Sequence, residues 1–244
     1  VFLGTSGCGK TTLMRMVNAM VTPTSGRVFV RDQDVAGEDP VRLRRSIGYV
    51  LQEGGLFPHR SIADNIATVP RLEGATKQAS RERALELLEL VGLDREMADR
   101  YPAQLSGGQR QRVGVARALA NRADILLMDE PFGALDPIVR TELQCELKEI
   151  QRVLGTTILF VTHDVDEAFT LGDQVAVLST GGHIEQVGTP TELLSSPASP
   201  FVAEFVGASR AARPVRVAGP GGLVVDDAGT PVGTLTTDEA GERP

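Results

Sequence analysis

The sequence has few cysteines, no tryptophan and no long hydrophobic run. Its two cysteines, Cys8 and Cys145, lie far apart in the sequence, so we expect no structural disulfide and a reducing cytosol. The longest apolar runs, ILLM and ILFV, are far shorter than the roughly 20 residues that a membrane-spanning helix needs. Contact with a membrane would therefore require a partner.

Basic residues are outnumbered by acidic ones. The formal net charge is -7 and the isoelectric point is near 5.1. A protein that coats nucleic acid needs a basic surface, so we expect no nucleic-acid partner. The chain does have 244 residues with 41% hydrophobic content, enough to bury the core of one large domain or of two small lobes.

Short apolar runs alternate with amphipathic helices, which predicts an α/β fold with a buried parallel sheet. The predicted strands of this sheet cover 1–3, 125–128, 157–161 and 174–179. A helix predicted over 11–20 places four apolar side chains on one face: Leu13, Met16, Val17 and Met20. Polar residues follow several of the strands, and open α/β sheets place their ligand crevice at these carboxyl ends.

Two lobes are expected beside the sheet. Residues 26–50, which end in IGYV, alternate and turn like antiparallel strands and predict a small β lobe. Residues from about 60 to 117 read as helical, with Ser80 as a helix cap and Gly92 as a stop. The apolar stripe of that helix comprises Ala84, Leu87, Leu88 and Val91. The composition of 208–244 predicts a linker with the remnant of another module.

Residues 4–11 read GTSGCGKT and fit the Walker A pattern, a glycine-rich loop between a strand and a helix. Such a loop turns backbone N–H groups toward phosphates, and the helix N-terminus adds partial positive charge. Lys10 would reach the β- and γ-phosphate oxygens, and the Thr11 hydroxyl would bind magnesium. Cys8 is expected to be a small filler. The predicted nucleotide-binding residues are Gly4, Thr5, Ser6, Gly7, Cys8, Gly9, Lys10, Thr11 and Thr12.

Two adjacent carboxylates, Asp129 and Glu130, follow an apolar strand, where charge is costly unless a cation or water compensates it. We expect Asp129 to join the magnesium shell and Glu130 to polarise the attacking water. Taken alone, the pair could equally be a turn with a helix cap. The phosphate loop upstream favours the catalytic interpretation.

Two further side chains are candidates for the same site. His163 follows a strand and would contact the γ-phosphate, although a lone histidine at a strand end is more often structural. Gln52 would sense metal or water, although an isolated glutamine by itself carries little information. His59 and His183 have no companions and are expected at the surface or in loops.

The predicted nucleotide is ATP with Mg²⁺. A guanine-reading NKxD motif is absent from the sequence, in which the nearest string is NRAD at 121–124. The sequence also has no Cys and His spacing typical of a metal site, so the metal implied is magnesium carried in with the nucleotide.

Six motifs in a fixed order carry a resemblance to a known family. They are GTSGCGKT at 4–11, Gln52, LSGGQ at 105–109, ILLMDE at 125–130, GALD at 133–136 and His163. Across residues 1 to about 207, the chain resembles the nucleotide-binding subunit of an ABC transporter. This resemblance implies a P-loop NTPase (RecA-like) core with a small antiparallel β lobe and an inserted helical subdomain. It assigns Glu130, His163 and Gln52 to catalysis, and Thr11, Gln52 and Asp129 to the metal.

The resemblance also gives a role to LSGGQ, a second glycine-rich helix opening that has no lysine. In the family, this turn of one subunit closes over the ATP that the P-loop of the other subunit holds, which implies a homodimer. The residues so assigned are Ser106, Gly107, Gly108 and Gln109. A helix N-terminus with a serine supplies neutral donors, which suits the far side of a triphosphate. A plain capped helix start would leave the paired glycines unexplained.

More finely, GGLFPHRSIADNI, LDPIVRTELQCEL and THDVDEAFTLGDQVAVL look like the ATPases of osmoprotectant importers for glycine betaine, choline or proline. This implies permease subunits in the membrane, a solute-binding protein as an indirect partner, and a peripheral place on the cytoplasmic face of the plasma membrane. Importers of polyamines or amino acids share much of the pattern. A cassette ATPase without transport is the rival class. A P-loop kinase would have no use for LSGGQ.

Both ends of the chain depart from the family pattern. Two strands and an adenine-stacking aromatic residue normally precede the Walker A strand, whereas this sequence starts inside that strand, so we expect a fragment or a misplaced start. Near the other end, GGLVVDDAGTPVGTLT at 221–236 is similar to one strand pair of a CBS module. We therefore expect 208–244 to hold a remnant of such a module.

Overall fold

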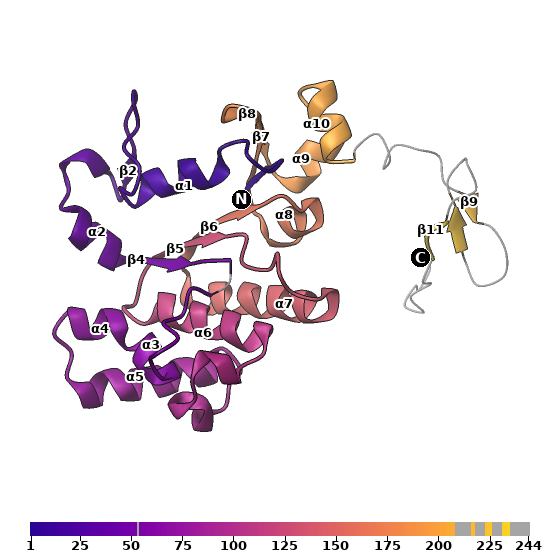
Figure 1. Cartoon of the computed structure of the whole chain (residues 1–244). Coiled ribbons are helices and arrows are strands. Elements are labelled where there is room, and N and C mark those ends of the chain that lie inside the picture. Colours follow the sequence, from indigo (N-terminus) through magenta and orange to yellow (C-terminus); the bar gives the residue numbers. More distant parts are fainter. Residues whose placement is uncertain (53, 208–215, 218–222, 226–230, 235–244) are drawn as a thin grey trace, which may run out of the picture. The chain divides into compact units, whose positions relative to one another are not determined.

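The computed structural model describes residues 1–52 and 54–207 and three short strands nearer the C-terminus (Figure 1). The chain forms two compact units, Val1–Pro190 and Thr191–Pro244. The boundary between the two units follows Pro190 and so precedes the change in amino-acid composition at about residue 207.

A six-stranded sheet forms the centre of the first unit, in the order β4-β5-β6-β1-β7-β8. Its strands are β1 (Phe2–Gly4), β4 (Ile47–Val50), β5 (Ile125–Asp129), β6 (Thr157–Thr162), β7 (Val175–Ser179) and β8 (His183–Gly188). Neighbouring strands pair in parallel except β7 and β8. β1 lies between β6 and β7, with Leu3 opposite both Thr162 and Val177. This order brings the carboxyl ends of β1, β5 and β6 to one edge.

The antiparallel lobe expected over 26–50 is smaller than predicted. It consists of the hairpin of β2 (Phe29–Val30) and β3 (Gln33–Asp34). The prediction that IGYV belongs to it is wrong, because these residues form β4 and pair in parallel with β5. Between the hairpin and β4 lie a 3₁₀ turn, η1 (Val35–Gly37), and the helix α2 (Pro40–Ser46). Ile47 and Val50 of β4 are buried, as in the interior of a parallel sheet.

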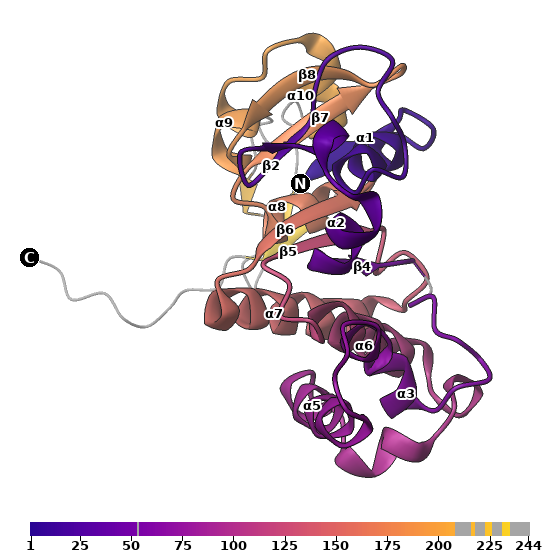
Figure 2. The same ribbon diagram turned by 90° about the vertical axis from the view of Figure 1, so that its left-hand side faces the viewer.

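Successive residues of the central strands pack on opposite faces of the sheet. Leu127 and Val161 join a core cluster with Met14 of α1 (Lys10–Val17) and with α2. Leu126 and Met128 face a larger cluster that includes residues of α6 (Gly107–Leu119) and α7 (Pro137–Leu154). Figures 1 and 2 show α1 and α2 on one side of β4, β5 and β6, and α7 on the other.

The helix after the glycine loop is shorter than predicted. α1 ends at Val17, and Met20 lies beyond it with 55% of its surface exposed. The chain leaves the helical direction at Ala19, whose φ is 54°, so Met20 cannot continue the apolar face. The side chain that anchors α1 in the core is Met14, which is fully buried.

The helical subdomain predicted at about 60–117 contains four helices and two 3₁₀ turns. These are α3 (Ile62–Ile66), α4 (Thr68–Leu72), α5 (Lys77–Leu90), η2 (Arg95–Asp99), η3 (Pro102–Gln104) and α6. The predicted apolar stripe of α5 is buried, and Gly92 ends the segment with a φ of 68°. Ser80 is not the cap: the Thr76 hydroxyl accepts from Ala79 N at 3.2 Å, one turn earlier, and Ser80 is buried inside the helix.

The remaining elements follow β6 and β8. α8 (Val165–Leu171) lies between β6 and β7, and α9 (Pro190–Ser195) begins at the boundary between the units. The second unit continues with α10 (Pro200–Phe205) and a three-stranded sheet of β9 (Arg216–Val217), β10 (Leu223–Val225) and β11 (Pro231–Thr234). None of the helices in the described segments is long and apolar enough to cross a membrane.

Candidate functional site

The loop from Gly4 to Lys10 connects β1 to α1, as the Walker A pattern predicts. Two of its glycines have left-handed backbones, Gly7 with a φ of 79° and Gly9 with a φ of 111°. A Cβ at Gly4 would lie 2.5 Å from the carbonyl oxygen of Leu178 on β7, so only glycine fits there. The loop conformation is therefore specified by residue type at its start, middle and end.

Lys10 is held in place by the loop that precedes it. Only 4% of its surface is exposed, and Nζ donates to the carbonyl oxygens of Gly4 at 2.7 Å and Thr5 at 2.9 Å. The third donor of the ammonium group reaches only Cys8 Sγ among the described residues, a weak acceptor 4.0 Å away, so it is available to an anionic ligand. Cys8 is buried against Ala176 and Leu178 of β7, as expected of a filler side chain. Both cysteines are free, and Cys145 is exposed.

Thr11 and Asp129 come together from α1 and β5. Thr11 Oγ1 donates to Asp129 Oδ1 at 2.8 Å, which joins a hydroxyl and a carboxylate oxygen at the carboxyl edge of the sheet. Such hard oxygen ligands suit Mg²⁺, which usually keeps waters and substrate phosphates as its other ligands. In the described part of the chain, no cluster of three His, Cys, Asp or Glu side chains could hold a metal alone. The pair therefore fits a magnesium ion that arrives with a nucleotide.

Glu130 occupies an unusual backbone position directly after β5. Its φ is 44°, a left-handed backbone conformation that residues other than glycine rarely adopt. Glu130 N donates to the carbonyl oxygen of Val161 at 3.0 Å, so the residue is still tied to β6. Its Oε2 lies 3.0 Å from Nδ1 of His163. This strained conformation aims the carboxylate at the histidine, and such strain often marks a functional site.

Lys10, Thr11 and Glu130 border a common cavity of about 210 Å³. Its walls are formed by Ser6, Gly7, Gly9, Lys10, Thr11, Thr12 and Glu130. The structure therefore brings the glycine loop and the strand-end carboxylate together. Within the part of the chain that the structure describes, no residue of LSGGQ at 105–109, here called the signature turn, lines this cavity.

The signature turn and Gln52 meet at a second cavity, of about 340 Å³, whose lining includes Gln52, Gly107 and Leu135. The Gln52 amide also approaches the first site, because a Cβ at Gly133 would lie 3.4 Å from Gln52 Nε2 and 3.9 Å from Glu130 Oε2. Gln52 thus lies between the strand-end carboxylate and the signature turn.

The signature sequence opens α6 with a capping box. Ser106 Oγ accepts from Gln109 N at 3.2 Å, and Gln109 Oε1 accepts from Ser106 N at 2.9 Å. The second glycine has a packing reason, since a Cβ at Gly108 would lie 2.7 Å from Val139 Cγ1 on α7. At Gly107 the nearest contact would be 3.5 Å, so this glycine is not required by packing within the chain.

Sequence reasoning missed a buried polar group behind His163. Glu167 on α8 is only 4% exposed, and its Oε2 accepts from Thr162 Oγ1 at 2.6 Å. Burial raises the pKa of Glu167, while the bond from Thr162 acts in the opposite direction. Arg140 of α7 pairs with Asp164, which caps α8. The only sequence signal was the acidic run that follows His163, which is also typical of an ordinary helix start.

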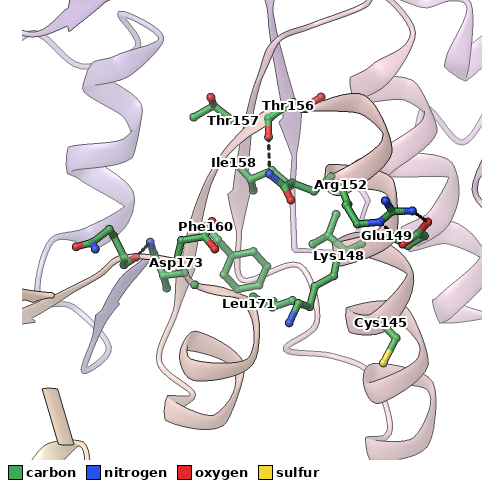
Figure 3. A pocket seen from close by; sticks show the side chains of 16 residues that line it. Cys145, Lys148, Glu149, Arg152, Thr156, Thr157, Ile158, Phe160, Leu171 and Asp173 are labelled. Atoms are coloured by element: carbon green, nitrogen blue, oxygen red, sulfur yellow. Dashed lines mark hydrogen bonds and ion pairs between the residues drawn. The ribbon is translucent and has the colours of Figure 1, made fainter. Parts of the chain in front are cut away.

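A larger cavity, of about 700 Å³, lies away from this site (Figure 3). It is bordered by the last turns of α7, which carry Lys148 and Arg152, and by Thr157 at the amino end of β6. The glycine loop and Glu130 belong to the carboxyl edge of the sheet, whereas this cavity is lined by residues at the amino ends of β1, β6 and β7.

The glycine loop, the Thr11–Asp129 pair and Glu130 lie in a segment that also matches one family in sequence. The family described as ABC transporter matches residues 1–133. The chain belongs to the ABC transporter family. Its solved relatives include a dimeric structure of a post-hydrolysis state of the ATP-binding cassette MJ0796 bound to ADP and Pi. That structure is 33% identical, with a TM-score of 0.69, and the match covers 78% of this chain and 84% of that one.

Two curated members of the ABC family illustrate the range of solutes. The glycine betaine/carnitine/choline transport ATP-binding protein OpuCA of Bacillus subtilis is 55% identical over 86% of this chain and 55% of its own length. The spermidine/putrescine import ATP-binding protein PotA of Frankia alni is 47% identical over 93% of this chain and 50% of its own length. The chain thus spans about half the length of these ABC relatives. The family resemblance and fold class predicted from the motifs are confirmed.

Proposed function

We propose that this chain is the ATP-hydrolysing subunit of an ABC importer. The observation that carries the proposal is the convergence of Lys10, the Thr11–Asp129 pair and the Glu130–His163 pair at one edge of the sheet. A cationic group, two metal-binding oxygens and a carboxylate aimed by a histidine are the parts that a phosphoryl-transfer site needs. The proposed ligands are ATP and Mg²⁺.

Each side chain has a separate task in this proposal. Lys10 and the loop N–H groups hold the β- and γ-phosphates, and Thr11 and Asp129, with Gln52 nearby, would hold magnesium. Magnesium, when bound, supplies positive charge that stabilises the phosphate oxygens. Glu130 would accept a proton from the attacking water, and His163, whose Nδ1 lies 3.0 Å from Glu130 Oε2, would orient this carboxylate and contact the γ-phosphate.

The signature turn is proposed to serve the partner of a homodimer. Ser106, Gly107, Gly108 and Gln109 do not border the cavity of their own glycine loop. Gly107, which packing does not require, would leave room for a phosphate to approach the N-terminus of α6. The dimeric state of the related cassette MJ0796 is consistent with this arrangement.

The transported solute is proposed to be an osmoprotectant such as glycine betaine, choline or proline. The higher identity to the Bacillus subtilis relative favours this class over the polyamine class of the Frankia alni relative. Permease subunits and a solute-binding protein would complete the importer, with this subunit on the cytoplasmic face of the membrane. A polyamine or amino-acid importer, and a cassette ATPase without transport, are the alternatives.

Uptake by the assembled importer tests this proposal. The neighbouring genes are searched for a permease and a solute-binding protein, and these are reconstituted with the protein in vesicles. ATP-dependent uptake of labelled glycine betaine, choline and proline is compared with that of spermidine and glutamate. We expect uptake of at least one osmoprotectant, and no uptake when Glu130→Gln replaces the unmodified subunit. Uptake of spermidine or glutamate alone would contradict the solute class, and hydrolysis without any transport would contradict the importer.

A further inference from the structure

The first turn of α7 links the signature helix to the segment that carries His163. On one side, Val139 of this turn packs so closely on α6 that a Cβ at Gly108 would lie 2.7 Å from its Cγ1. On the other side, α7 contacts α8, which begins just after His163. The residue of this turn that reaches α8 is Arg140.

Arg140 contacts two carboxylates at once. Its Nη1 donates to Asp164 Oδ2 at 3.1 Å, and its Nε lies 3.7 Å from Glu167 Oε1. Nε is buried and makes no hydrogen bond to any described residue. The Asp164 side chain is 31% exposed and that of Glu167 is 4% exposed, so solvent screens the second pair poorly. Arg140 is therefore the positive charge that compensates a buried carboxylate.

The same two carboxylates fix the backbone on both sides of His163. Thr162 Oγ1 donates to Glu167 Oε2 at 2.6 Å and accepts from Asp164 N at 3.0 Å. Asp164 Oδ1 also accepts from Asp166 N at 2.9 Å at the start of α8. Because Thr162 and Asp164 flank His163, this network sets the position from which the imidazole meets Glu130.

We propose that Arg140 is a positioning residue for ATP hydrolysis: it fixes the His163 segment to the first turn of α7, and so holds His163 against Glu130. The inference rests on the proposed function, because it assumes that Glu130 and His163 act in hydrolysis. A purely structural ion pair would stabilise the fold without acting through His163, so the two roles can be separated by measurement.

A double-mutant cycle with His163 makes this separation. Arg140→Met is expected to lower kcat roughly tenfold or more, the usual effect of losing a hydrogen bond to a charged group. The KM for ATP should change little, because the glycine loop is untouched. In a His163→Ala background, Arg140→Met should cause no further loss, since residues that act through one group are not additive. Arg140→Lys keeps the charge and should recover part of kcat.

Arg152→Met is the matched control. Arg152 lies on the same helix, about three turns beyond Arg140, and it is exposed and pairs with Glu149 of that helix. It should leave kcat unchanged in both backgrounds. If Arg140→Met unfolds because Glu167 loses its partner, the Arg140→Met/Glu167→Gln variant carries the test, since it buries no unpaired carboxylate.

Losses that multiply in the His163→Ala background would overturn the inference, because Arg140 would then act independently of His163. The unmodified protein is assayed in the same series. Its failure to hydrolyse ATP would overturn the proposed function and this inference with it. If the unmodified protein hydrolyses ATP but the losses from Arg140→Met and His163→Ala multiply, only this inference is overturned.

Discussion

Glu130→Gln is expected to lower ATP turnover by about 10²–10⁴, the usual contribution of a positioned general base. Glutamine keeps the size of the side chain and a carbonyl oxygen that can still face His163 Nδ1. It cannot accept a proton from water. The affinity for ATP should be retained, because the groups that would hold the phosphates lie on the glycine loop and at the start of α1.

Steady-state hydrolysis and equilibrium binding of a labelled ATP analogue measure the two effects separately. Glu149→Gln is the matched control, because Glu149 is an exposed glutamate of α7 whose ion-pair partner among the described residues is nearby Arg152. It should leave both quantities unchanged. Near-normal hydrolysis by the Glu130→Gln variant would remove Glu130 from the role of general base.

Gly107→Asp is expected to lower the rate of ATP hydrolysis strongly, without changing ATP binding to the protein's own glycine loop. A Cβ at Gly107 meets no atom closer than 3.5 Å, so the fold should accept the substitution. A carboxylate in the first turn of α6 is also compatible with the helix dipole. In a shared site, however, it would face the partner's triphosphate. Like charges about 4 Å apart near a protein surface repel by about 4 kcal/mol, which corresponds to a loss of turnover of roughly 10²–10³.

Gly107→Ala separates the charge from the added volume, and it should retain most of the turnover. Binding of ATP to the protein's own glycine loop should be unchanged in both variants, since Gly107 does not border that cavity. Equal turnover by Gly107→Asp and Gly107→Ala would mean that the signature turn does not approach a phosphate.

The central sheet and the glycine loop were predictable because each has a sequence pattern with few structural alternatives. The position of Lys10 at the end of the glycine loop followed from the Walker A pattern. The contact between Asp129 and Thr11 followed from the rule that the carboxyl ends of parallel strands lie at one edge of the sheet. The strand at 47–50 was assigned to the wrong sheet because its neighbours in sequence form a hairpin. Whether a short apolar strand pairs with its sequence neighbours or with a distant strand depends on packing that local periodicity does not contain.

Other features could not be predicted from the sequence, and one of them, the cap of α5, was predicted wrongly. Thr76 and Ser80 can both cap a helix, and packing decides that Ser80 is buried inside α5. Arg140 is one of many arginines in the sequence, and nothing in its neighbours predicts contacts with both Asp164 and Glu167. The left-handed conformation of Glu130 was also not predictable, because it is imposed by bonds to β6 and to the turn at Gly133.

Crosslinking between two chains tests most directly whether the nucleotide site is shared. Cys8 and Cys145 are first changed to serine, and Glu130→Gln is added so that dimers with bound ATP accumulate. One chain then receives Ser6→Cys, at an exposed position of the glycine loop, and a second chain receives Ser106→Cys, at the signature turn. Thermal unfolding of the Ser106→Cys chain checks that the weakened cap of α6 leaves it folded.

The two chains are mixed and treated with a short thiol crosslinker, with and without ATP. A shared site predicts an ATP-dependent band at twice the chain mass in the mixture and much less in either chain alone. A chain that carries both cysteines provides the opposite test. If it forms an internally crosslinked monomer under saturating ATP while the mixture gives no dimer band, the two turns meet within one chain, and the shared site is contradicted.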